Sequence, residues 1–205
     1  MIRHGGWAHT HAPPLLLHAP RIGGFALIVL GGSRRLARAA SGQKRYTNAC
    51  MCTWRSTLKR YLNELGKPHI VLAGLKLWVH SYQYRNADDY DDANWLNATA
   101  ICAEKGATVV VEGAFVRTID IFAWQRAVQE LAVNLVGEAK LECLESDIAV
   151  TLKGGALGAV DMEVQITPDQ LTQEHRFAFA IDQSHLGPLA SQCTRLLNDF
   201  PIRGA

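Results

Sequence analysis

The densest group of side chains that could do chemistry is a run of four aspartates within the segment NADDYDDANWLN: Asp88, Asp89, Asp91 and Asp92. Clustered carboxylates can bind calcium, but a loop of the EF-hand type needs oxygen ligands at positions 1, 3 and 5 and a glutamate at position 12. A frame that begins at Asp89 has Ala93 at position 5 and Ala100 at position 12, and a frame that begins at Asp88 has Tyr90 at position 3. The spacing therefore does not predict a calcium loop.

Three interpretations of the aspartate run stay open. It could be a solvated acidic turn that leads into a strand. It could be a docking patch for a basic partner, because complementary charge speeds association; its residues would be Asp88, Asp89, Tyr90, Asp91 and Asp92. It could also border the pocket of an enzyme or ligand-binding domain, with the mouth lined by Tyr82, Tyr84, Asp91, Asp92 and Trp95.

Elsewhere the sequence offers little chemistry. It has no G-x-x-x-x-G-K-[ST], G-x-G-x-x-G followed by a helix, G-x-S-x-G or H-E-x-x-H pattern. The histidines after residue 70 stand at unrelated spacings: His80, His175 and His185. The five cysteines are odd in number and mostly far apart, which favours reduced thiols in a cytoplasmic protein over disulfides or a zinc site. We therefore predict no catalytic residue, no metal and no cofactor.

The charge is divided unevenly along the chain. Residues 1–70 hold eleven Lys and Arg and one acidic residue, so residues 71–205 hold the other ten basic and eighteen acidic residues. The two parts carry about +10 and −8, and the near-neutral total is a cancellation. A surplus of acid over residues 71–205 suits a basic protein partner rather than nucleic acid.

The first part has the composition of a segment outside the folded domain. Residues 1–70 show no sustained hydrophobic period, their basic residues are scattered, and the apolar run from Gly23 to Gly32 is too short to span a membrane. We expect a poorly ordered leader, or upstream sequence joined to the chain by a misassigned start. One short helix is expected over 53–65, where apolar residues follow the spacing i, i+3, i+4, i+7.

Residues 71–205 are expected to form a single acidic domain. Alternating apolar residues predict strands over 75–85, 139–145, 148–154, 160–166 and 175–182, and a hairpin over 95–116. Helical periodicity predicts helices over 117–137 and 184–199. The order β-β-β-α-β-β-β-β-α predicts an α+β fold with one mainly antiparallel sheet of about seven strands and two helices packed on one face.

Several segments resemble a known family. They are the strand LKLWVHSYQYR with the acidic turn into Asn94-Trp95-Leu96, a helix containing Trp124, the turn VQITPDQL, and a last helix that ends at Phe200-Pro201-Ile202-Arg203. Over about residues 75–203 the layout resembles the bacterial WapI-type immunity proteins. On this resemblance the structural anchors are Asn94, Trp95, Leu96, Trp124, Phe200 and Pro201.

The resemblance implies a non-enzymatic cytoplasmic protein. Such proteins bind the toxic C-terminal domain of a contact-dependent toxin and block it, and these domains are often nucleases and hence basic. The sequence does not give the toxin, the interface or the oligomeric state, and a small globular domain with some other role remains the alternative.

Overall fold

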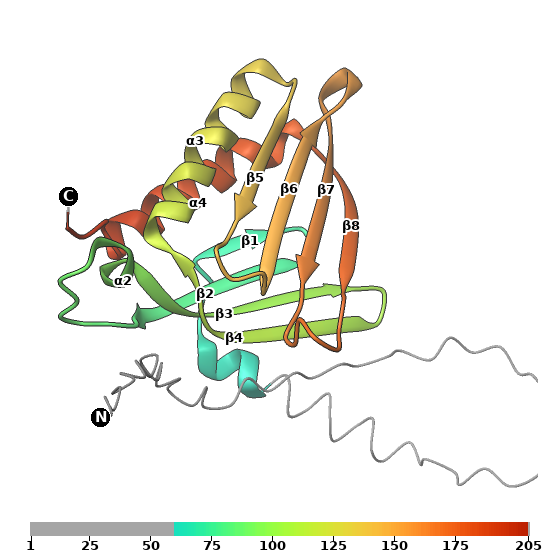
Figure 1. Ribbon diagram of the computed structural model, residues 1–205. Coiled ribbons are helices and arrows are strands. Elements are labelled where there is room, and N and C mark those ends of the chain that lie inside the picture. Colours follow the sequence, from blue (N-terminus) through green and yellow to red (C-terminus); the bar gives the residue numbers. More distant parts are fainter. Residues whose placement is uncertain (1–59, 205) are drawn as a thin grey trace, which may run out of the picture.

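The computed structural model describes residues 60–204, which form two four-stranded sheets and the helices beside them (Figure 1). The first sheet has the order β1-β2-β3-β4: Ile70–Leu72, Leu75–Tyr82, Trp95–Glu104 and Ala107–Arg117. The second sheet has the order β5-β6-β7-β8: Glu138–Glu142, Ile148–Gly154, Ala159–Ile166 and Arg176–Asp182. Every neighbouring pair is antiparallel. The predicted α+β class is confirmed, but eight strands in two sheets replace about seven in one.

Two long helices pack beside the sheets. Helix α3 covers Thr118–Asn134 and α4 covers Leu186–Asp199, close to the predicted bounds. They lie against each other, with α3 also packed on β5 and α4 on β1 (Figure 1). Helix α3 ends where Leu135 adopts a left-handed conformation (φ 55°). Short 3-10 turns precede β7 and α4, at Ala156–Gly158 and Gln183–His185.

One hydrophobic core joins the two sheets and the two helices. Buried side chains of both sheets and of α3 and α4 belong to the same cluster, with Trp124 of α3 fully buried among them. In β7 the side chains of Val160, Met162 and Val164 point inward and alternate with exposed or partly exposed neighbours. This alternation is what the period of a strand produces when one face is solvated.

The split into two sheets follows from α3. The chain leaves β4 at Arg117, runs through seventeen helical residues and returns as β5, and β4 pairs with β3 only. Hydrophobic alternation reports which face of a strand is buried but not which strand lies beside it, so the sequence did not distinguish one sheet from two. Strand β1 is three residues long, too short to show a period.

A second apolar cluster lies on the outer face of the first sheet. Trp78, Ile101 and Val110 are buried there beneath side chains of the helix over residues 60–65. The helix places Tyr61, Leu62 and Leu65 on this cluster. The Trp78 indole N–H also donates to the carbonyl of Gly66 at 3.0 Å. The folded structure therefore includes residues 60–70. The rest of the predicted helix, 53–59, and the predicted leader before it lie outside the described residues.

Candidate functional site

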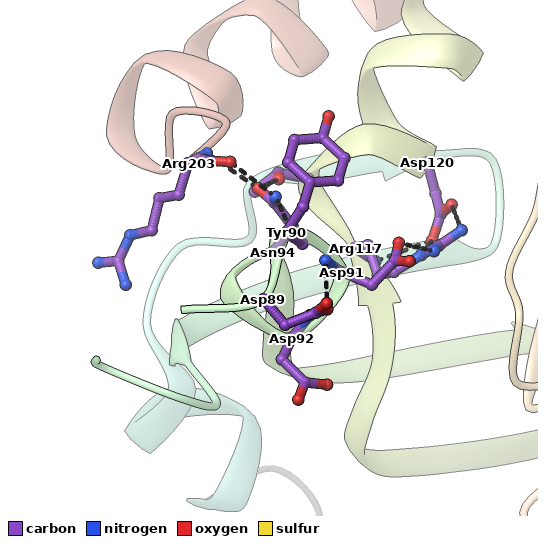
Figure 2. A network of polar contacts seen from close by, with 9 residues as sticks. Asp89, Tyr90, Asp91, Asp92, Asn94, Arg117, Asp120 and Arg203 are labelled. Atoms are coloured by element: carbon purple, nitrogen blue, oxygen red, sulfur yellow. Dashed lines mark hydrogen bonds and ion pairs between the residues drawn. The ribbon is translucent and has the colours of Figure 1, made fainter. Parts of the chain in front are cut away.

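The aspartate run folds into a one-turn helix, α2 (Tyr90–Ala93), between β2 and β3. The Asp89 side chain accepts hydrogen bonds from the backbone N–H groups of Asp91 and Asp92, at 2.9 and 3.2 Å (Figure 2). These are the donors that a helix leaves unpaired at its start, and aspartate is a preferred residue for satisfying them. The Asp89 side chain therefore stabilises the first turn of this helix.

Asn94, directly after α2, is fully buried and holds three parts of the chain together. Its amide nitrogen donates to the carbonyls of Tyr90 and Arg203, at 2.7 and 3.0 Å. Its amide oxygen accepts from the Arg203 backbone N–H at 3.0 Å and from the Thr118 hydroxyl (Figure 2). All the hydrogen-bonding positions of this buried side chain are thus used, which joins α2, the first residue of α3 and the end of the chain.

Arg117, the last residue of β4, pairs with two aspartates. Its guanidinium lies 2.8 Å from the Asp120 carboxylate, which is 6% exposed, and 2.8 Å from that of Asp91, which is 63% exposed (Figure 2). The hydrogen bond to Asp120, more than any other contact, raises the pKa of Arg117. The guanidinium also lies 5.7 Å from the centre of the Trp95 ring. Asp91 therefore faces an internal cation.

The end of the chain lies against β2. The Tyr82 hydroxyl donates to the Pro201 carbonyl, and the Phe200 ring meets the Tyr82 ring edge to face at a centroid distance of 5.7 Å. The Arg203 guanidinium carbon lies 3.3 Å from the centre of the Tyr82 ring, and its nitrogen donates to the carbonyl of Tyr84 at 3.4 Å. Partial burial raises the pKa of Tyr82. Phe200, Pro201 and Arg203 thus contact Tyr82, one of the residues that the enzyme alternative placed at a pocket mouth.

Three of the predicted docking residues have side chains that lie on the surface of the turn. Asp88, Tyr90 and Asp92 are exposed on the surface of the turn, while Asp89 and Asp91 contact the rest of the protein. In Figure 2 the Asp92 carboxylate points away from the network. The aspartate run is thus partly structural and partly an exposed surface.

The residues predicted as structural anchors differ in how deeply their side chains are buried. Leu96 and Trp124 are fully buried in the main core, as Asn94 is in its network, whereas Trp95 and Phe200 are half-buried and Pro201 is exposed. From the sequence, Asp120 is a candidate cap of the helix over 117–137 and Arg203 belongs to the closing segment that carries the resemblance, whereas Arg117 has no assigned role. The spacing of Arg117 and Asp120 at the start of a helix was a readable signal of capping, but nothing in the sequence linked Asn94 to a residue 109 positions later.

Two open hollows lie elsewhere on the described surface. One, of about 410 Å³, lies over β6, β7 and β8; its lining includes Thr151, Asp161 and Ala180. The other, of about 400 Å³, lies between β1 and α4, beside His69 and Arg195. Neither is lined by the residues that the enzyme alternative placed at a pocket mouth.

Within residues 60–204 no three His, Cys, Asp or Glu side chains gather as ligands of one metal ion. In the same part of the chain, no helix combines the length and the apolar character that crossing a membrane requires.

Comparison with known proteins gives one match. The model of the immunity protein WapI-like family matches residues 70–201, from β1 to the residue that receives the Tyr82 hydroxyl bond. No curated protein and no solved structure shows significant similarity. The matched segment covers well over half of the 205 residues and contains both sheets and both long helices. The chain therefore belongs to the WapI-like immunity protein family.

Proposed function

We propose that this protein is a non-enzymatic immunity protein of the cytoplasm that binds and neutralises a basic toxin domain. The observation that carries the proposal is the family match over residues 70–201. The surplus of eight acidic residues over 71–205 supports a basic partner, because a net field of one sign attracts its opposite at long range.

The turn around α2 is the proposed contact surface. Asp88, Tyr90 and Asp92 are exposed beside one another in sequence, on a turn held by Asn94 and by the Asp91–Arg117 pair. A fixed turn presents its side chains with little ordering cost on binding, and tyrosine is among the residues that contribute most at protein interfaces. The two free carboxylates supply the charge that a basic partner meets.

Co-expression with the toxin tests the binding itself. The toxin candidate is the C-terminal domain of a secreted protein encoded beside this chain's gene. The proposal expects growth of cells that express both proteins, arrest of cells that express the toxin domain alone, and a complex that survives purification. Arrest despite soluble co-expression, with no complex recovered, would contradict the proposal.

Binding kinetics test the contact surface separately. Substituting Asp88→Asn together with Asp92→Asn is expected to slow association with the toxin domain by about 3- to 10-fold at low salt, because rim charges act mainly on the association rate. The control removes two exposed carboxylates elsewhere, by Glu130→Gln with Glu174→Gln. Equal effects of the two double variants would mean that the whole acidic surface attracts the toxin and that the α2 turn is not its contact.

A further inference from the structure

The hydrogen bonds of the second sheet show which backbone groups of β8 are left without a strand. The N–H of Ile166 donates to the carbonyl of His175 at 3.0 Å, in line with the β7–β8 register. In an antiparallel pair, hydrogen-bonded and non-hydrogen-bonded positions alternate. The positions that bond to β7 are therefore the odd ones, and the backbone groups that point away from β7 are those of Arg176, Ala178 and Ala180 and, at the strand's end, Asp182.

The other three sheet edges in the described part of the chain are protected. At β1 the Gln192 side chain of α4 pairs with both backbone groups of Val71: its oxygen accepts from the N–H and its nitrogen donates to the carbonyl. Helix α3 packs on β5. In β4, Phe115 is an extra residue that interrupts the register with β3, and Gly113 has a φ of 144°. Covers and bulges of this kind prevent edge-to-edge pairing.

Within residues 60–204, no strand pairs with the outer edge of β8 and no bulge interrupts its register. All seven of its residues pair with β7 without a register shift, and the sequence RFAFAID contains neither proline nor lysine. In Figure 1, β8 is the outermost labelled strand of the second sheet. Its two central outward residues are Ala178 and Ala180, small side chains that leave the hollow of about 410 Å³ open beside the edge. Among the described residues, the backbone groups of this edge therefore have no strand partner.

The ends of this edge carry opposite charges. Arg176 is 60% exposed and Asp182 is 62% exposed, and both lie on the solvent face of the sheet. If two copies of β8 pair antiparallel with their centres at Phe179, Arg176 of each copy stands opposite Asp182 of the other. Ala178 then stands opposite Ala180 on the solvent face, while on the inner face Phe179 of one copy stands opposite Phe179 of the other. Only outward-pointing backbone groups face each other in this register, as hydrogen bonding between strands requires.

We propose that β8 is a self-pairing edge, through which two copies of the protein join their second sheets into one continuous eight-stranded sheet. The interface is two-fold symmetric, which is the commonest geometry of protein dimers. Opposite charges in directly opposed positions stabilise a strand pair and fix its register. On the outer face of the second sheet Arg176 already pairs with Glu163 of its own chain at 3.0 Å, and Asp161 lines the hollow beside the edge. The proposal does not rest on the proposed function.

Measuring the mass of the full 205-residue chain in solution over a range of concentrations tests the pairing. Light scattering coupled to size exclusion is expected to give twice the monomer mass. Ala178→Pro should return the mass to that of the monomer, because it removes an outward N–H that β7 does not use. Ala178→Ser, which keeps the N–H at the same position, should remain a dimer. A monomer at every concentration overturns the proposal. So does a dimer that Ala178→Pro leaves unchanged while circular dichroism shows the fold intact.

A charge exchange tests the register. Arg176→Glu places two acidic residues opposite each other at both ends of the interface and should raise the dimer dissociation constant at least about 10-fold. Adding Asp182→Lys restores an opposite pair and should recover most of the loss. Asp182 also accepts from the Ser184 N–H, so the thermal midpoint of each variant is measured alongside. Equal dimer affinity in the wild type and the Arg176→Glu variant would overturn this register.

Discussion

Replacing Asn94 by aspartate tests whether its amide is the link between α2, α3 and the end of the chain. The substitution keeps the shape of the side chain and its oxygen that accepts from Thr118 and Arg203. It replaces the amide nitrogen, which donates to the carbonyls of Tyr90 and Arg203 at 2.7 and 3.0 Å, by an acceptor. The carbonyls of Tyr90 and Arg203, in part-buried contacts, then face a carboxylate on a side chain that has no exposed surface.

The expected cost is large for a change of one atom. Each buried polar group left without a partner costs about 1–3 kcal/mol, and an uncompensated buried charge about 3–5 kcal/mol. Because these costs overlap, we expect Asn94→Asp to lower the free energy of unfolding by about 3–5 kcal/mol at pH 7.5, a large share of the total for a domain of this size.

The sign of the pH dependence follows from the same contacts. Burial and two facing carbonyl oxygens favour the neutral form, so the pKa of the new carboxyl in the folded state lies above its unfolded value of about 3.9. The unfolded state releases this proton at a lower pH than the folded state does. The loss of stability is therefore full above the folded pKa and shrinks as the pH falls toward the unfolded value. The difference from wild type should be smaller at pH 4.5 than at pH 7.5.

Urea unfolding followed by tryptophan fluorescence at both pH values is the assay, with Asn97→Asp as the matched control. The Asn97 amide donates to the Ser81 hydroxyl at 3.2 Å in a partly buried site, and that hydroxyl can turn and donate to a carboxylate instead. The control should cost less than about 1 kcal/mol. If Asn94→Asp costs no more than the control, or if its cost is the same at both pH values, the assigned role of Asn94 is wrong.

Three further substitutions test other parts of the structure. Arg117→Met should lower the free energy of unfolding by about 3–5 kcal/mol, because it leaves the buried Asp120 carboxylate without its cation. Asp91→Asn, at the exposed side of the same cluster, should lower it by less than about 1 kcal/mol. Similar losses for the two variants in urea unfolding would contradict this difference. A Cβ at Gly74 would lie 2.2 Å from the Ala103 carbonyl oxygen, so Gly74→Ala should lower the thermal midpoint, while Gly187→Ala, in the first turn of α4 with open space around it, should raise it slightly. Leu62→Asp should release the helix over 60–65 and so make this segment sensitive to limited proteolysis while the main core stays folded; protection equal to wild type would mean that the helix does not depend on its apolar contacts.

Local features of this fold were predictable from the sequence, and long-range ones were not. The alternation of Leu75, Leu77 and Val79 placed them on one face of β2, and they lie in the main core. Trp78 alternates with them and was assigned to the other face, where it is buried by Leu62 and its neighbours in the helix over 60–65. A period of two separates the faces of a strand, but it does not show that an upstream helix covers the second face.

For the acidic turn, too, the sequence did not predict the long-range contacts. One helical turn is too short for a hydrophobic period, so nothing identified α2 in advance. The partners of Asp91 and of Asn94 come from β4, α3 and the end of the chain. Which aspartates stay free for a partner depends on those distant contacts, and composition gives only the total charge.

The residues that carry the family resemblance are not the residues that we propose to contact a partner. The segments that carry the resemblance, Asn94-Trp95-Leu96 and the chain end at Phe200 to Arg203, meet in space and hold each other. Their side chains are occupied by internal contacts, so a shared pattern there indicates a shared fold and does not specify a partner. On the proposed function, selection of one toxin would fall to exposed residues without such contacts, for example Asp88 and Asp92 in the turn around α2. Exchanging these exposed residues between two members of the family should therefore change which toxin is bound without changing stability, whereas exchanging the residues around Asn94 should do the reverse.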